Sequence, residues 1–177
     1  MQASPELERR AARIKLLLMD CDGVLTDGRI WLLEGGDEQK SFNTRDGLGL
    51  YLLHKAGLQS GIISGRTSKA VELRARGLGM EFVYQDCLDK MKAFEEILAK
   101  AGVIESQVAY VGDDLTDIPL IKRVGLGVAV GDAAPETQSV AHYVTKAVGG
   151  KGAIREMVES ILKSQGRWSD IVSHYLD

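Results

Sequence analysis

The sequence has few cysteines, no long apolar run and no excess of basic charge, and each shortage excludes a class of protein. Its two cysteines, Cys21 and Cys87, form no Cys-x-x-Cys pair, so neither a disulfide framework nor a zinc site is indicated. The apolar stretch 14–19 is too short to span a bilayer, and residues 1–15 are charged where a signal peptide would carry an apolar core. We therefore expect a cytoplasmic protein without a membrane partner.

The charge balance also argues against a nucleic-acid partner. The chain has 22 basic and 25 acidic residues, a formal net charge of -3, and general nucleic-acid binding needs a basic face. Its 177 residues, 45% of them hydrophobic, fit one globular domain over residues 1–177. No linker, repeat or low-complexity tract interrupts the chain.

Apolar runs of strand length alternate with segments of helical period, and this alternation predicts parallel strands joined by crossover helices. The expected strands are residues 14–20, 59–64, 107–113, 126–130 and 142–145, with one more before Lys90. The expected helices are residues 46–56, 68–78, 90–101, 114–124 and 150–163, with a short one after Ala134. We expect an α/β fold with a Rossmann-like, doubly wound parallel sheet.

Two segments depart from this alternation. Residues 29–44 form two β-rich runs around Glu34-Gly35-Gly36-Asp37, which predicts a small β-hairpin inserted after the first strand. The tail, residues 166–177, is either a docking arm or a loose end. Trp31 in the hairpin and Trp168 in the tail are candidates for contact with neighbouring subunits.

Polar residues gather at the expected carboxyl ends of the strands, where open parallel sheets place their ligand crevice. They are Asp20 and Asp22, Ser64-Gly65-Arg66, Gly112-Asp113-Asp114, and Lys90 at the start of a helix. In an extended strand the carboxylates of Asp20 and Asp22 point to the same side and repel each other. A metal ion and a lysine would offset that repulsion, and Mg²⁺ favours such oxygen ligands.

Each of these signals has a plainer explanation when it is taken alone. The Asp-x-Asp pair could be a turn or a helix cap, and Ser64 an ordinary loop residue. Lys90 could be a solvated helix residue, although a cation in the first helical turn is unfavourable against the macrodipole. The four signals together favour one active site.

Together, DCDGVLTDG, the serine of ISGR, Lys90 and GDDLTD resemble the four motifs of the haloacid dehalogenase superfamily. The resemblance implies that Asp20 attacks phosphorus and forms an aspartyl phosphate, and that Asp22 is the general acid and base. It implies that Mg²⁺ is held by the Asp20 side chain, the Asp22 backbone carbonyl and the Asp113 side chain. Ser64 and Lys90 would bind the phosphate.

The same resemblance makes Asp114 and Asp117 supporting acidic residues behind the metal ligands. The gaps between the motifs leave no room for a cap domain, so the chain resembles the capless members. An open crevice suits phosphoryl transfer poorly, and capless relatives assemble tetramers through the hairpin, so we expect a homotetramer.

A narrower resemblance is to the family of 3-deoxy-D-manno-octulosonate (KDO) 8-phosphate phosphatases. It rests on DGVLTDG, SFNTRDGLGL, ISGRTSKAVELRARGLGM and above all GGKGAIREM. It implies Mg²⁺-dependent hydrolysis of KDO 8-phosphate in lipopolysaccharide precursor synthesis. In that family the tail can reach a neighbouring active site, although RWSDIVSHYLD is less small and polar than some tails of the family.

The sugar-binding residues and the substrate are less defined. Arg66 and Arg74 are candidates for binding phosphate or the sugar-acid carboxylate, because a guanidinium suits oxyanions. Arg45 and Asp46 could meet the sugar across an interface, and surface salt bridges would explain all four residues equally well. Two alternatives stay open: a phosphatase for a nine-carbon acid 9-phosphate (KDN or N-acylneuraminate), and a non-catalytic regulatory domain of the same fold.

Overall fold

The structure, a computed structural model, describes residues 5–176 and is built around one parallel sheet. The sheet has six strands in the order β5-β4-β1-β6-β7-β8, and every neighbouring pair is parallel. The strands are β1 (Leu16–Met19), β4 (Gln59–Ile63), β5 (Phe82–Tyr84), β6 (Val108–Gly112), β7 (Leu126–Ala129) and β8 (Tyr143–Val144). The predicted α/β fold with a doubly wound parallel sheet is confirmed.

The order of the strands places β1 at the point where the direction of winding reverses. From β1 the chain continues to β4 and β5 on one side, whereas β6, β7 and β8 extend the sheet on the other side. All four residues of β1 are buried, as expected for a central strand covered on both faces. In open parallel sheets the ligand crevice lies beyond the strand ends at this reversal, so the residues after Met19 occupy the expected place.

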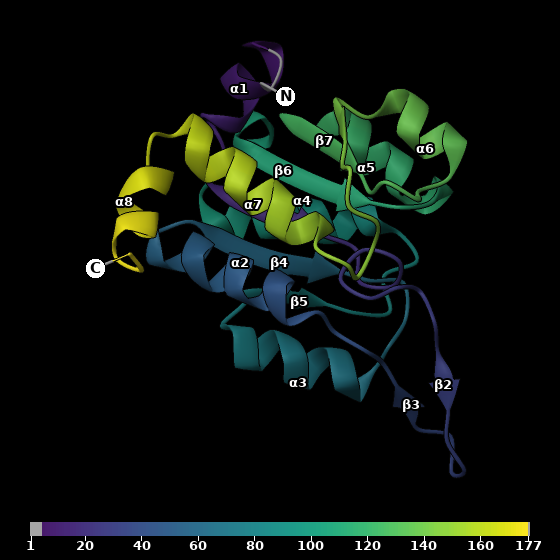
Figure 1. Cartoon of the computed structure of the whole chain (residues 1–177). Helices are drawn as coiled ribbons and strands as arrows, with labels where there is room; N and C mark the ends of the chain where they lie inside the picture. Colours follow the sequence, from purple (N-terminus) through teal and green to yellow (C-terminus); the bar gives the residue numbers. More distant parts are fainter. Residues whose placement is uncertain (1–4, 177) are drawn as a thin grey trace.

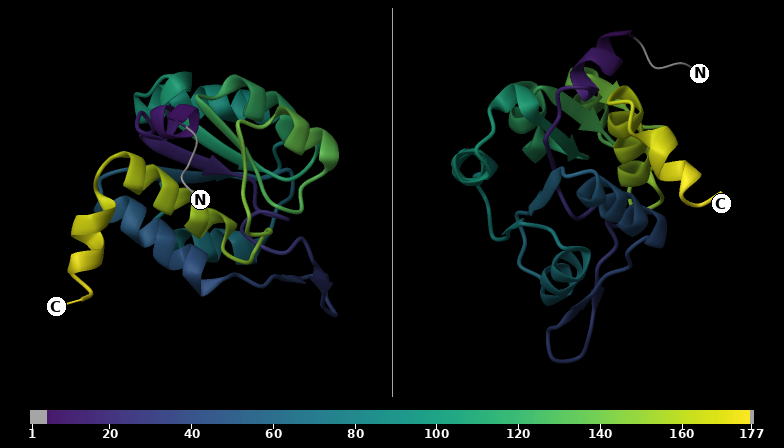
Figure 2. Two further views of the ribbon diagram at one scale, coloured as in Figure 1. Left: turned by 45° about the horizontal axis from the view of Figure 1, so that its top comes forward. Right: turned by 90° about the vertical axis from the view of Figure 1, so that its left-hand side faces the viewer.

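Helices cover both faces of the sheet (Figure 2). Successive side chains of β1 alternate between the two layers, with Leu17 and Met19 in one core and Leu16 and Leu18 in the other. The first core takes its helical residues mainly from α1, α2, α3 and α7, and the second takes them mainly from α4 and α5. The helices are α1 (Pro5–Ala11), α2 (Thr44–Lys55), α3 (Lys69–Leu78), α4 (Lys90–Ala101), α5 (Ile118–Arg123), α6 (Pro135–Val140), α7 (Ala153–Ser164) and α8 (Trp168–Ser173).

Three helical segments differ from the prediction. Helix α1 lies in a charged stretch and helix α8 in the tail, and no helix was expected in either segment. The helix expected over residues 114–124 is split into a 3₁₀ turn, η2 (Leu115–Asp117), and α5. The split follows from Asp117, whose carboxylate accepts the N–H groups of Asp113 and Asp114 and holds the chain in a tight turn.

The predicted hairpin is present as the short strands β2 (Trp31–Leu32) and β3 (Glu38–Gln39), which pair antiparallel. It extends away from the sheet at the end where β4 points (Figure 1). Helix α8 lies at the other end of α2 and packs on its own chain: Arg155 and Lys163 each lie 5.3 Å from the centre of the Trp168 ring. The described part of the tail is therefore a docked helix, and residue 177 lies outside the described residues.

No helix within the described residues has both the length and the apolar character to cross a membrane.

Candidate active site

The carboxylate of Asp20 is fixed directly after the central strand. Its backbone N–H donates to the carbonyl of Val111 (3.0 Å), which continues the pairing between β1 and β6. The Cys21 N–H donates to Asp20 Oδ1 (2.6 Å), and Asp20 Oδ2 lies 2.9 Å from the ammonium nitrogen of Lys90. Both oxygens therefore have a defined partner, and the carboxylate is held rather than free to rotate.

Lys90, the first residue of α4, is buried among carboxylates. Asp89 caps the helix by accepting the Met91 N–H (3.0 Å), which fixes the first turn that carries Lys90. Its ammonium nitrogen lies 2.6 Å from Asp117 Oδ1 as well as contacting Asp20. Burial by itself would lower the pKa of Lys90, but the two carboxylates outweigh burial and raise it. The lysine therefore carries its charge in the site.

Asp117 is the residue that connects these parts. It is fully buried and accepts hydrogen bonds from the Tyr110 hydroxyl (2.7 Å) and the Asp113 N–H (2.9 Å). It also accepts the hydrogen bond from Lys90 (2.6 Å). One carboxylate thus holds β6, the turn after it and the start of α4 in a fixed arrangement. The predicted supporting role of Asp117 in the reaction stays a prediction.

Asp20, Asp113 and Asp117 form what we call the acidic cluster, in which one carboxylate oxygen from each residue lies within 4.8 Å of the others. Burial raises the pKa of Asp113 to about 8, and Asp117 and Asp20 act in the same direction. Burial also raises the pKa of Asp20 to about 6, although Lys90 opposes the shift. Three carboxylates thus lie close together, and one lysine pairs with two of them. This deficit of positive charge and the oxygen-only donor set both fit a divalent cation such as Mg²⁺.

The loop after β1 packs directly against the acidic cluster. Gly23 has a φ of +83°, and a Cβ built on it would lie 2.1 Å from Asp113 Oδ2. Gly149, in the GGKG segment, approaches the same loop so closely that a Cβ there would lie 1.8 Å from the Gly23 carbonyl oxygen. The Gly150 N–H donates to the Val24 carbonyl (2.9 Å). Residues without side chains are therefore needed on both sides of this contact.

Asp22 belongs to a second group of charges, which we call the hairpin network: Asp22, Glu38, Lys40 and Arg66. The Lys40 ammonium lies 2.5 Å from Asp22 Oδ1 and 3.6 Å from Glu38 Oε2. Arg66 forms an ion pair with Glu38, and its Nε lies 3.8 Å from Asp22 Oδ2. The network joins the end of β3, the ISGR segment and the loop after β1.

The charges around Asp20 and Asp22 are arranged differently from the expectation that one lysine offsets the repulsion between them. Strand β1 ends at Met19, and only Asp20 continues its pairing with β6. Lys90 pairs with Asp20, whereas Lys40 and Arg66 pair with Asp22. Each carboxylate therefore has its own cationic partners. The backbone carbonyl of Asp22 as a metal ligand stays a prediction.

The ISGR segment places Ser64 at the end of β4. Ser64 is buried, its N–H donates to the Tyr84 carbonyl (2.9 Å), and its carbonyl accepts the Cys87 N–H (3.0 Å). The Ser64 hydroxyl oxygen accepts the Arg66 N–H at 3.4 Å. These bonds fix the loop that carries the serine, and its predicted contact with phosphate stays a prediction.

The remaining predicted residues are not members of the acidic cluster. Asp46 does not have the exposed position that contact with a sugar across an interface requires. It is fully buried, and its carboxylate accepts the N–H groups of Gly152 (3.1 Å) and Arg155 (2.8 Å) at the start of α7. It therefore caps a helix and is not available to a sugar at an interface. Arg74 donates to the Asn43 carbonyl (3.4 Å).

Arg45 is exposed in the first turn of α2, and its backbone N–H donates to the side chain of Asn43, which caps the helix (2.8 Å). Its predicted contact with the sugar stays a prediction. Asp114 is also exposed, and its carboxylate accepts the Leu115 N–H (2.7 Å).

Sequence reasoning missed Lys40 and Tyr110. Neither carries a motif signal: Lys40 reads as a polar hairpin residue, and Tyr110 as one apolar residue of a buried strand.

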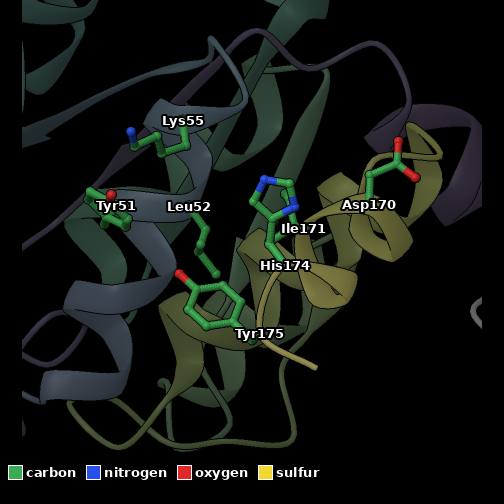
Figure 3. A pocket seen from close by; sticks show the side chains of 7 residues that line it. All are labelled: Tyr51, Leu52, Lys55, Asp170, Ile171, His174 and Tyr175. Carbon is green, nitrogen blue, oxygen red and sulfur yellow. The ribbon is translucent and has the colours of Figure 1, made fainter. Parts of the chain in front are cut away.

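A cavity of about 520 Å³ lies away from these charges, between α2 and the C-terminal segment (Figure 3). Leu52 and Lys55 line it from α2, and Ile171 and Tyr175 line it from the tail. None of the predicted catalytic or metal-binding residues borders this cavity. It marks where the tail packs, and it does not extend the acidic cluster.

Comparisons with known proteins agree with this arrangement. A family model for haloacid dehalogenase-like hydrolases matches residues 65–157. The 3-deoxy-D-manno-octulosonate 8-phosphate phosphatase of Yersinia pestis is 46% identical over 159 residues, which cover 90% of this chain and 85% of that protein.

The solved structures that are similar over nearly the whole chain include two with bound metal ions. The phosphatase of the same name from Moraxella catarrhalis, in complex with a magnesium ion, a phosphate ion and KDO, has a TM-score of 0.95 at 38% identity and covers 98% of this chain and 99% of that chain. The cobalt-bound phosphatase of Haemophilus influenzae has a TM-score of 0.90 at 38% identity and covers 95% of this chain and 99% of that chain.

Proposed function

Since this chain belongs to the haloacid dehalogenase-like hydrolases and, among them, to the KDO 8-phosphate phosphatase family, we propose that it hydrolyses KDO 8-phosphate to KDO and phosphate. The reaction is a step in lipopolysaccharide precursor synthesis. One observation carries the proposal: Lys90 lies between Asp20 (2.9 Å) and Asp117 (2.6 Å), with Asp113 in the same cluster. The Moraxella relative, which binds magnesium, phosphate and KDO, supports the choice of substrate and ion.

Asp20 is the nucleophile of the proposed mechanism. Its carboxylate attacks phosphorus, the bond from phosphorus to the sugar oxygen breaks, and an aspartyl phosphate forms on Asp20. Asp22 gives its proton to the departing sugar oxygen and then takes a proton from the water that hydrolyses the aspartyl phosphate. Lys90 and Ser64 hold the phosphoryl oxygens. Free phosphate and the original enzyme are the result.

A bound Mg²⁺ would supply positive charge next to the transferring phosphoryl group. The side chains of Asp20 and Asp113 and the backbone carbonyl of Asp22 would hold it. Arg66 is half-exposed next to Asp22 and is the candidate for the sugar-acid carboxylate. The acidic Asp22 also argues against a purely regulatory domain, because a domain that only holds phosphate does not need a second acid.

A homotetramer assembled through the hairpin (residues 29–44) is part of the proposal. The support is a row of exposed apolar side chains: Trp31 is 60% exposed, Leu32 75% and Leu33 49%. Light scattering and sedimentation would measure the assembly. A single domain over residues 1–177, which includes residues outside the described part, and a cytoplasmic location complete the proposal, and cell fractionation tests the location.

A phosphate-release assay with Mg²⁺ tests the function on KDO 8-phosphate, KDN 9-phosphate and simple sugar phosphates. We expect the highest kcat/KM for KDO 8-phosphate and no activity in an Asp20→Asn variant. A higher kcat/KM for the nine-carbon ester would overturn only the assignment of KDO 8-phosphate as the substrate. Absence of phosphate release from every ester would overturn the proposal that the protein is a phosphatase. An active Asp20→Asn variant would overturn the role of Asp20 as the nucleophile.

A further inference from the structure

Lys40 occupies an unusual place for a lysine. It follows directly after β3, and its side chain is fully buried, with a relative exposure of 0%. Burying an ammonium is costly unless carboxylates compensate, and here Asp22 and Glu38 do so. A well-packed apolar residue would fill such a site at lower cost. The lysine therefore suggests a task beyond stabilising the fold.

The contacts of Lys40 make the two oxygens of Asp22 different. Oδ1 accepts the hydrogen bond from the Lys40 ammonium at 2.5 Å. Oδ2 is buried and has no hydrogen-bond partner within residues 5–176; the nearby cation is Arg66, whose Nε lies 3.8 Å away. The short hydrogen bond from Lys40 occupies Oδ1, whereas Oδ2 accepts no hydrogen bond within the described residues and has only the longer ion pair with Arg66. Oδ2 is therefore the oxygen that is better placed to hold and release a proton.

We propose that Lys40 is a positioning residue that holds Asp22 through Oδ1 and so makes Oδ2 the atom that moves the proton. This inference rests on the function proposed above. In the first step the proton leaves Oδ2 for the sugar oxygen, which keeps the electron pair of the broken bond to phosphorus. In the second step the attacking water returns a proton to Oδ2, so the carboxyl ends as it began.

The position of Lys40 also links the hairpin to the chemistry. Glu38 on β3 pairs with Lys40 and with Arg66 of the ISGR segment, so movement of the hairpin base moves both cations next to Asp22. A residue that only anchored the hairpin would affect every substrate equally. A residue that orients the general acid affects mainly those substrates whose leaving group needs a proton.

The test compares two phosphate esters in a Lys40→Met variant, which keeps the length of the side chain and removes the ammonium. KDO 8-phosphate has a poor alkoxide leaving group, whereas p-nitrophenyl phosphate has a good one that needs no acid. We expect kcat/KM to fall about 100-fold for the sugar ester, because positioned proton transfer contributes roughly 10²–10⁴-fold. For the aryl ester, kcat/KM reports the phosphoryl transfer to Asp20 and should fall less than about 10-fold.

Two further variants separate positioning from structure. Lys163→Met is the matched control, because it removes an exposed lysine–carboxylate pair with Glu159 (2.9 Å) on α7, and it should leave both reactions unchanged. In an Asp22→Asn background, adding Lys40→Met should cause no further loss with the sugar ester, since Lys40 acts through Asp22. A further loss there would overturn the proposal.

Equal losses for the two esters, or none in Lys40→Met, would overturn the positioning role while leaving the proposed function intact. A wild-type protein inactive toward both esters would overturn the proposed function and this role with it. The thermal unfolding midpoint shows whether Lys40→Met is folded. If Lys40→Met is unfolded, the same comparison of the two esters is made with Lys40→Gln, which keeps a hydrogen-bond donor, and that comparison decides whether Lys40 positions Asp22.

Discussion

Gly23→Ala tests whether the position of Asp113 controls the site. Gly23 has a φ of +83°, which residues with a side chain rarely adopt. A Cβ at this position would lie 2.1 Å from Asp113 Oδ2 and 2.6 Å from its Cγ, well inside van der Waals contact. The Asp113 carboxylate, or the loop that carries Gly23, therefore has to move.

The expected loss follows from that displacement. Backbone strain of a left-handed alanine costs about 1–2 kcal/mol of folding free energy. Restoring ordinary contact requires a shift on the order of 1 Å, and a misplacement of that size in an active site can lower the rate by about 100-fold. We therefore expect weaker Mg²⁺ binding and a kcat/KM for KDO 8-phosphate about 100-fold below that of the parent.

Gly57→Ala is the matched control. Gly57 has a similar φ of +77°, but nothing lies within 4 Å of a Cβ built there. Both variants should lose similar stability in thermal unfolding, and only Gly23→Ala should lose Mg²⁺ affinity in calorimetric titration and phosphate release. If Gly23→Ala binds Mg²⁺ and turns over like Gly57→Ala, the reasoning that Asp113 must sit where it does is refuted.

Three other perturbations address the fold, the pH dependence and the assembly. Asp46→Ala leaves buried N–H groups at the start of α7 without their acceptor, which should lower the free energy of unfolding by about 1–3 kcal/mol; chemical denaturation measures it. Burial lowers the pKa of His54, so the folded state binds fewer protons than the unfolded state. Neutral His54 therefore contributes folding stability above its unfolded pKa of about 6.5, and this contribution is lost as the pH falls through the folded pKa. His54→Gln should remove that part of the slope, and an unchanged slope in pH-dependent unfolding would contradict the assignment. Trp31→Ser should weaken the proposed homotetramer, and an unaltered mass in light scattering would contradict assembly through the hairpin.

The fold could be predicted largely from local patterns. Buried strands read as continuous apolar runs, and α4 has the predicted bounds, Lys90–Ala101, because an apolar face and a final glycine define it. The split of the helix predicted over residues 114–124 could not be read in the same way. It depends on the contacts of Asp117 with two preceding N–H groups and with Lys90.

The site was predictable where a motif marks it. Asp20, Lys90 and Asp113 stand at strand ends or at a helix start, and the parallel sheet brings them together. Asp46 was misassigned, because its neighbours in sequence suggest an exposed helix start. Its burial comes from α7, where it accepts the N–H of Gly152, 106 residues further along the chain.

The sequence by itself determined the order of strands and helices, the carboxylates and lysine of the proposed chemistry, and the family. These depend on local periodicity and on residues at strand ends. Only the tertiary structure decided which cation each aspartate takes: Lys90 for Asp20, and Lys40 with Arg66 for Asp22. The reason is that ion pairs between distant segments are set by how the chain packs in three dimensions, which no local pattern of residues records.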